Sequence, residues 1–423
     1  MNSLSLLLWI ALGIGMQVAL YLGIGFWRHW QEYRALQGRD HELNLPPPRP
    51  ALLVEEPEPV APAWQGFRSF RVERKVFEDA LQSVCSFYLV PEDGQPLPAF
   101  LPGQFLTFRF DVPAASGSTE QLVRCYSLSD APRPEAYRIS VKRELPPAGS
   151  GLPPGRSSGF LHDHVEVGSR LQVRAPSGHF HIDRSDAPVV LIGGGIGITP
   201  MLSMANWCLA DQPGREVWLF YGVRNSRDMI MKPALEGLAA AHPNFRLRVC
   251  FSDALPEDVA VRDYQHRSRV DVNVLRMQLP LKAYQFYICG PNPMMESLVP
   301  ALEDWGVPDA RIHFEAFGPA SVKRRTTTTA AAAVAGNETG IMINFAKSGK
   351  QLPWQPASGS LLEFAEANGI AVNSGCRAGG CGSCQTTIQS GEVAYRQVPD
   401  FDPEPGSCLL CVCSPKTSVT LEA

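Results

Sequence analysis

The sequence predicts a multidomain chain: a single transmembrane helix, an antiparallel β-barrel, an α/β domain with a parallel sheet, and a C-terminal α+β domain. Three observations predict this class. A long uncharged apolar segment opens the chain, short alternating strands and then buried strands with helical stretches fill its middle, and a group of cysteines lies near its end. With 423 residues, the chain has room for about three domains.

The apolar segment covers residues 4–26 and contains no charged side chain in 23 positions. As a helix it would span about 35 Å, enough for a hydrocarbon core of about 30 Å. A cleaved signal peptide is the alternative, but the run is too long and lacks a basic leading region. Because Arg28 and Arg34 follow it, we expect a single-pass protein of a bacterial-type inner membrane, with the N-terminus outside and the other domains cytoplasmic.

Small residues recur at four-residue steps in this segment, at Ala11, Gly15, Ala19 and Gly23. Such a stripe lets a second transmembrane helix approach closely, and it predicts a contact with another copy of the chain or with a membrane partner. The alternative is that small residues are simply common in membrane helices.

Two segments predict linkers between folded parts. Residues 31–65 are rich in proline, which favours an extended tether, and residues 319–337 have no amphipathic period and predict a flexible connection. The predicted domains are residues 66–183, 187–318 and 338–423.

The first two of these domains differ in their strand pattern. Short alternating strands with turn signals, such as 105–110 and 137–142, predict a small antiparallel barrel. Buried apolar strands at 189–192, 217–221 and 285–289 alternate with helical stretches, which predicts a parallel sheet.

Four cysteines of the last domain have the spacing C-x4-C-x2-C…C. They are Cys376, Cys381, Cys384 and, 26 residues later, Cys411. This is the plant-type ferredoxin spacing for a 2Fe–2S cluster, whereas a zinc site would more often show paired C-x2-C knuckles. The sequence therefore predicts a protein that moves single electrons, in a reducing compartment that keeps the ligands as thiolates.

A glycine-rich turn follows the first parallel strand and precedes a helical stretch. Glycines there allow a pyrophosphate to approach the N-terminus of the helix. A second motif ends another strand at the same carboxyl edge, where open parallel sheets bind ligands. The residues of the two motifs are Gly193, Gly195, Gly197 and Thr199, and Cys289, Gly290 and Pro291.

Together with Arg124-Cys125-Tyr126-Ser127, these motifs resemble, in this order, the ferredoxin–NADP reductase superfamily. The segment 124–318 looks especially like the reductase module of flavohaemoglobins and of NADH reductases that serve hybrid-cluster proteins and oxygenases. With the ferredoxin-like (β-grasp) end, the resemblance covers nearly everything after residue 66. It implies an FAD-binding barrel, an NAD(P)-binding α/β domain and a 2Fe–2S domain.

The resemblance also implies roles for residues in the flavin site. Arg124 pairs with the flavin pyrophosphate, Tyr126 stacks on the isoalloxazine, and Ser127 bonds near its reactive N5 atom. Ser158 contacts a phosphate where a helix begins. Two of these residues have structural alternatives, because Arg124 could be an exposed strand arginine and Tyr126 an ordinary barrel tyrosine.

In the nicotinamide site, the resemblance implies that Thr199 and Cys289 flank the ring and that Phe317 covers the other face of the flavin. Cys289 could instead be a small buried residue. For the fourth cluster ligand, Cys408 and Cys413 compete with Cys411, but the ferredoxin pattern L-x-C-x-x-x-P matches Cys411.

We therefore expect a reductase that passes electrons from NADH through FAD and the 2Fe–2S cluster to a membrane-associated oxygenase, hydroxylase or desaturase. A quinone-directed or respiratory NADH oxidoreductase and a redox sensor are the alternatives. The net charge of −4 gives no indication of nucleic-acid binding. NADPH stays open as the coenzyme, because Arg224 and Arg227 could bind a 2′-phosphate whereas Asp228 could bind a ribose hydroxyl.

Overall fold

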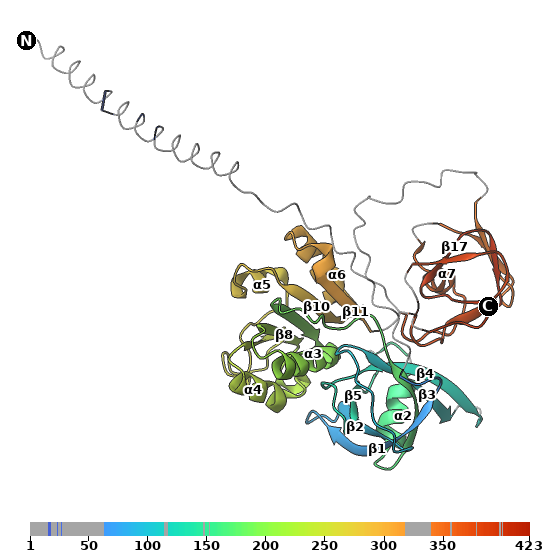
Figure 1. Ribbon diagram of the computed structural model, residues 1–423, viewed down its shortest axis with the longest axis horizontal. Coiled ribbons are helices and arrows are strands. Elements are labelled where there is room, and N and C mark those ends of the chain that lie inside the picture. The colour runs from blue at the N-terminus through green and yellow to red at the C-terminus, as the bar shows by residue number, and fades with distance from the viewer. Residues whose placement is uncertain are drawn as a thin grey trace, which may run out of the picture. The chain divides into compact units, whose positions relative to one another are not determined.

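The computed structural model describes residues 63–317 and 340–423, together with Met16, Gln17, Gly23 and Trp27. The gaps within those two ranges are positions 114–116, 147–148, 152, 356–357, 378, 397–398 and 400. The chain divides into two compact units, residues 1–60 and 61–423. The strands β1 to β18 and the helices α2 to α7 all belong to the second unit (Figure 1).

Six antiparallel strands form the first sheet of this unit, in the order β4-β3-β6-β1-β2-β5. An isolated bridge between Leu128 and Ile139 joins its two edges, so that the sheet closes into a barrel. Phe70, Phe87 and Phe108 are wholly buried in its core. The helix α2 packs against β3 and β5. The bounds are β1 Arg68–Phe77, β2 Val84–Pro91, β3 Phe105–Pro113, β4 Thr119–Ser127, β5 Tyr137–Lys142, α2 Arg156–His164 and β6 Arg170–Ser177.

Five parallel strands form the second sheet, in the order β11-β10-β7-β8-β9. The chain runs outward from β7 through β8 and β9 and then returns to place β10 on the other side of β7. The strand order therefore reverses between β7 and β10, and a crevice opens at their carboxyl ends. The strands are β7 Val189–Gly194, β8 Val217–Val223, β9 Phe245–Phe251, β10 Gln285–Gly290 and β11 Ile312–Ala316.

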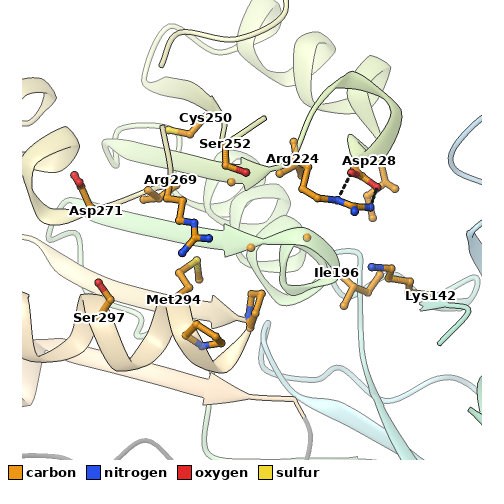
Figure 2. A pocket seen from close by; sticks show the side chains of 18 of the residues that line it. Lys142, Ile196, Arg224, Asp228, Cys250, Ser252, Arg269, Asp271, Met294 and Ser297 are labelled. Carbon is orange, nitrogen blue, oxygen red and sulfur yellow. Dashed lines mark hydrogen bonds and ion pairs between the residues drawn. The ribbon is translucent and has the colours of Figure 1, made fainter. Parts of the chain in front are cut away.

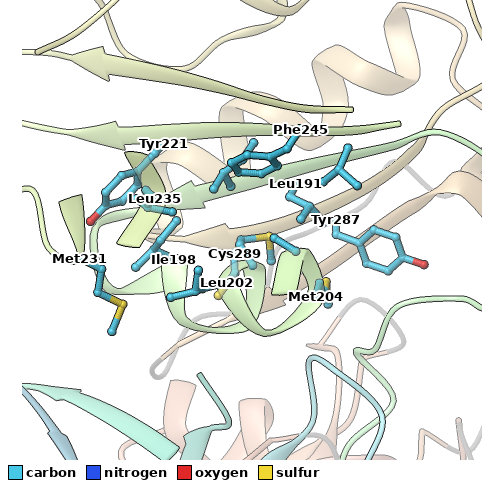
Figure 3. Packing of buried hydrophobic residues seen from close by; sticks show 14 of the residues in the cluster. Leu191, Ile198, Leu202, Met204, Tyr221, Met231, Leu235, Phe245, Tyr287 and Cys289 are labelled. Carbon is cyan, nitrogen blue, oxygen red and sulfur yellow. The ribbon is translucent and has the colours of Figure 1, made fainter. Parts of the chain in front are cut away.

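Helices cover both faces of this sheet because its strands are apolar on both faces. Leu191 packs against α3 and α4 in one core, which Figure 3 shows, and its neighbour Ile192 faces a second core with α5 and α6. The helices are α3 Ile198–Asp211, α4 Lys232–Ala241, α5 Val272–Gln278 and α6 Asn292–Asp304.

The C-terminal domain combines a five-stranded sheet, in the order β13-β12-β18-β14-β16, with the helix α7 and the pair β15-β17. A capping box fixes the start of α7, because Ser360 accepts from the backbone of Glu363 and the Glu363 side chain accepts from that of Ser360. The elements are β12 Met342–Phe345, β13 Lys350–Pro353, α7 Leu361–Ala367, β14 Gln385–Ser390, β15 Val393–Tyr395, β16 Ser407–Leu409, β17 Cys413–Pro415 and β18 Val419–Leu421.

The structure contradicts the predicted localisation as a single-pass inner-membrane protein. Among the residues that the structure describes, no helix has both the length and the apolar character to cross a bilayer. The longest described helix, α3, has 14 residues and spans about 21 Å, short of a hydrocarbon core of about 30 Å. The predicted span 4–26, including its small-residue stripe, and the two predicted linkers lie almost wholly outside the described residues.

Candidate active site and cluster loop

A cavity of about 570 Å³ lies over the carboxyl edge of the parallel sheet (Figure 2). The turn after β7, the ends of β8 and β9, the loop before α5 and the start of α6 line it, and Ser83 and Lys142 of the barrel complete its wall. The volume is that of a typical ligand pocket, and the place is where open parallel sheets bind nucleotides. The cavity is therefore the candidate coenzyme site.

Charged side chains line this cavity. Arg224 donates two hydrogen bonds to the carboxylate of Asp228, at 2.7 and 3.0 Å, which raises the pKa of the guanidinium. Lys142 and Arg269 add positive charge to the wall (Figure 2). Asp271 instead accepts from the backbone of Val274 at 2.9 Å and caps α5. Three basic and two acidic side chains thus line the cavity, and this small positive excess suits an anionic coenzyme.

The two motifs of the carboxyl edge lie against each other. A Cβ atom on Gly197 would stand 2.1 Å from the carbonyl oxygen of Cys289, so only glycine permits this contact. Gly195 has φ +54° and lines the cavity, and a Cβ atom there would meet no atom of the other described residues within 4 Å. Gly197 therefore serves packing between the turns, and Gly195 leaves the backbone open toward a ligand. Gly193, Gly194, Gly290 and Pro291 belong to the same junction.

The two side chains predicted beside the nicotinamide are both buried. Thr199 is 2% exposed and donates from its hydroxyl to the carbonyl of Ile196 at 2.9 Å, in the first turn of α3. Cys289 is wholly buried among the residues that pack on α3 (Figure 3). This packing fits a small buried residue as well as a site residue, so the role of Cys289 at the nicotinamide stays a prediction.

The predicted flavin residues lie on β4 and at the start of α2. Arg124 is exposed, whereas Tyr126 is partly buried, with its ring edge against Phe108 at 5.8 Å. Ser127 is buried at the end of β4. Ser158 donates to the carbonyl of Gly155 and accepts from the backbone of Glu144, both at 3.1 Å, so its hydroxyl closes the first turn of α2.

Glu315, at the end of β11, begins the segment that by resemblance covers the other face of the flavin, but no role of its own was predicted for it. Its Oε2 atom is buried and has no hydrogen-bond partner among the residues that the structure describes. Burial raises the pKa of its carboxyl to about 8, although its interaction with Ser127 lowers the pKa in part. The residue pairs with Cys289 across the parallel strands, and Phe317 follows it with 39% of its surface exposed. An acidic residue two positions before the predicted lid was the signal available in the sequence.

The cluster loop directs backbone N–H groups at its sulfur atoms. The Cys376 N–H lies 3.2 Å from Sγ of Cys381, and the Gly380 N–H lies 3.2 Å from Sγ of Cys376. Gly379 and Gly382 have φ +76° and +71°, which folds the loop around the thiols. Donors aimed at thiol sulfurs fit thiolates that bind an iron–sulfur cluster.

The other three C-terminal cysteines separate into two groups. The thiol of Cys411 lies near that of Cys384, the last cysteine of the loop, and this interaction lowers the pKa of Cys384. Cys408 and Cys413 are free thiols that are wholly buried in the core of the C-terminal domain, where they interact with each other instead. This arrangement is compatible with Cys411 as the fourth ligand and with the other two as packing residues, and the assignment of all four ligands stays a prediction. Among the described residues, the sulfurs of Cys376 and Cys381 lie within 4.8 Å of each other and of the sulfur of Cys125 in β4.

The fold and these two sites define an NAD-dependent iron–sulfur flavoprotein oxidoreductase. The family model for oxidoreductase NAD-binding domains matches residues 191–299, and that for 2Fe–2S iron–sulfur cluster binding domains matches residues 343–416. FAD, a 2Fe–2S cluster and NADH are its cofactors.

Two known proteins are similar to about 60% of this chain. The flavohemoprotein of Rhizobium meliloti (strain 1021) is 41% identical over 268 residues, which are 63% of this chain and 64% of that protein. The chain thus spans just under two thirds of this curated relative. The flavohem-like FAD/NAD-binding domain of nitric oxide dioxygenase from Vibrio cholerae O1 biovar El Tor is 34% identical, with TM-score 0.52, over 60% of this chain and all of that domain.

A third similarity includes the C-terminal domain. Phthalate dioxygenase reductase, which carries electrons from pyridine nucleotides to a 2Fe–2S centre, is 28% identical with TM-score 0.51, over 86% of this chain and all of that one. The chain belongs to the flavohaemoglobin-like FAD/NAD-binding reductases of the ferredoxin–NADP reductase type, with a 2Fe–2S domain at its C-terminus.

Proposed function

We propose that this protein is the reductase component of an oxygenase, hydroxylase or desaturase system. The observation that carries the proposal is the order of the parts. The flavin barrel, the nucleotide domain and the 2Fe–2S domain follow one another along this chain, which is similar to phthalate dioxygenase reductase over the full length of that protein. FAD accepts a hydride, which is a two-electron unit, and the cluster delivers single electrons, so this order suits a one-electron acceptor protein.

The residues of the site have the following proposed roles. Arg124 and Ser158 bind the phosphates of FAD, while Tyr126 and Ser127 contact its ring system. Gly195 and its neighbours leave room for the coenzyme, and Phe317 covers the flavin from the other side. Thr199 and Cys289 position the nicotinamide. The cluster ligands are Cys376, Cys381, Cys384 and Cys411.

We propose NADH as the physiological coenzyme. The strongest argument is the ion pair between Arg224 and Asp228, because the carboxylate neutralises the arginine nearest the end of β8. A 2′-phosphate would have to displace that carboxylate and would also be repelled by it. A ribose hydroxyl, by contrast, can donate to Asp228.

The proposal is tested by electron delivery to four acceptors. Cys381→Ser should abolish NADH-dependent reduction of cytochrome c while leaving the reduction of ferricyanide by the flavin intact. The wild-type protein should reduce the oxygenase component of the phthalate dioxygenase system under anaerobic conditions. Faster reduction of a soluble ubiquinone analogue than of that oxygenase would contradict the oxygenase assignment.

A further inference from the structure

Arg174, on the outer face of the barrel in β6, contacts the cluster loop. Its Nη1 atom donates to the carbonyl oxygen of Cys381 at 2.6 Å. The guanidinium also lies against two aromatic rings, with its carbon 4.6 Å from the centre of Phe67 and 4.7 Å from that of Phe401. Phe67 precedes the first barrel strand and Phe401 belongs to the 2Fe–2S domain, so one side chain joins the two parts.

Phe401 in turn is part of the wall of the cluster loop. Its backbone N–H donates to the carbonyl of Gly379 at 3.0 Å. A Cβ atom on Gly382 would stand 2.7 Å from its ring, so the loop and the ring are in direct contact. A shift of the Arg174 side chain would therefore alter the position of the cluster loop through its contacts with Phe401 and Cys381.

On the barrel, Arg174 belongs to a row of residues that crosses three strands. Thr107 of β3 pairs with Arg174 on one side and with Cys125 of β4 on the other. The sulfur of Cys125 lies within 4.8 Å of those of Cys376 and Cys381. Cys125 is followed by Tyr126 and Ser127, the predicted flavin contacts, so this row leads from the flavin site to the cluster loop.

We propose that Arg174 is a positioning residue, which holds the cluster loop against β4 for electron transfer from FAD to the 2Fe–2S cluster. The proposal rests on the order of electron transfer given above. One electron leaves the reduced flavin and enters the cluster, and no bond to Arg174 forms or breaks. Arg174 keeps the cluster loop close to β4, and its positive charge stabilises the added negative charge of the cluster after it gains an electron.

The test compares Arg174→Met with Arg109→Met in the full-length holoprotein. Arg109, a residue of β3, stacks on the same ring, with its guanidinium carbon 4.4 Å from the centre of Phe67. It is therefore a matched control for the loss of a stacked guanidinium. Stopped-flow absorbance should show flavin reduction by NADH unchanged in both variants. Cluster reduction should slow about tenfold or more in Arg174→Met alone. Equal cluster reduction in Arg174→Met and wild type, or equal slowing by Arg109→Met, would overturn the proposal.

Hydrogen exchange measured on the oxidised holoprotein gives a second readout, independent of turnover. Arg174→Met should raise exchange in the cluster loop 375–384 and in β4, and Arg174→Lys should restore only part of the protection because its ammonium cannot stack as a planar fork. Unchanged exchange in both segments would reject the contact. If NADH failed to reduce the cluster in the wild type, the proposed function would fail, while the exchange result would still decide on the contact.

Discussion

Glu315 shows how burial sets the chemistry of a single residue. A carboxyl with a pKa of about 8 is mostly protonated at neutral pH, so it can donate a hydrogen bond where an ordinary glutamate can only accept. Its place, in contact with Ser127 and paired with Cys289, puts this donor between the predicted flavin and nicotinamide contacts. Glu315 therefore joins the predicted site as a proton-holding group.

The raised pKa predicts a pH-dependent stability. The folded chain keeps the proton up to about pH 8, whereas the unfolded chain loses it near the ordinary value of 4.5, so Glu315 destabilises the fold as pH rises between these values. Glu315→Gln cannot ionise and should gain roughly 2–4 kcal/mol over wild type by pH 8. Thermal unfolding followed by flavin fluorescence from pH 5 to 8 measures this. Glu296→Gln, an exposed carboxylate of α6, is the control, and a pH-independent difference for Glu315→Gln would contradict the prediction.

The ion pair between Asp228 and Arg224 predicts a preference for NADH over NADPH. Asp228→Asn should free Arg224 for a 2′-phosphate and remove a repulsive charge, which raises kcat/KM for NADPH by about tenfold. Steady-state kinetics with both coenzymes measure the ratio. The double variant with Arg224→Ala should lose the gain, because the effect requires the unpaired guanidinium. A rise in NADPH use that survives in the double variant would show that Arg224 is not the phosphate ligand.

At the scale of elements, the three candidates for the fourth cluster ligand lie in and between β16 and β17. Cys411→Ser should lose the visible absorbance and the electron paramagnetic resonance signal of the cluster, since this thiol contacts Cys384. Cys413→Ala should keep both and lose about 1–2 kcal/mol of stability, because it removes a small buried side chain that packs with Cys408. Loss of the cluster in Cys413→Ala together with retention in Cys411→Ser would reverse the assignment.

Sequence patterns predict the strands better than the contacts between them. The apolar runs at 189–192 and 285–289 lie within β7 and β10, because burial on both faces of a parallel sheet leaves a continuous apolar run in the chain. The sequence could not show that Gly197 lies against Cys289, since this depends on the strand order. Arg174 was missed for a similar reason, because its hydrogen-bond partner Cys381 lies 207 residues further along the chain.

At the scale of the whole molecule, the described contacts form one continuous series from the coenzyme cavity to the cluster loop. The cavity lies beside the junction of Gly197 and Cys289, Cys289 pairs with Glu315, and Glu315 contacts Ser127 of β4. From there β4 leads back to Cys125 at the loop. The nucleotide domain, the barrel and the 2Fe–2S domain thus contribute neighbouring residues, although the sequence patterns that indicate them are far apart.

This series predicts that residues 63–423 are sufficient for electron transfer. A chain without residues 1–62 retains every described element of the three domains, the cavity and the contact between Arg174 and Cys381. It should bind FAD and the cluster fully and reduce ferricyanide and cytochrome c with NADH at rates within about twofold of the complete chain, because none of the described site residues is removed. Flavin and iron content, followed by both acceptor assays on the two proteins, measure this. If cytochrome c reduction alone fell while ferricyanide reduction persisted, the first 62 residues would be needed to keep the cluster loop in place, and the series would be incomplete without them.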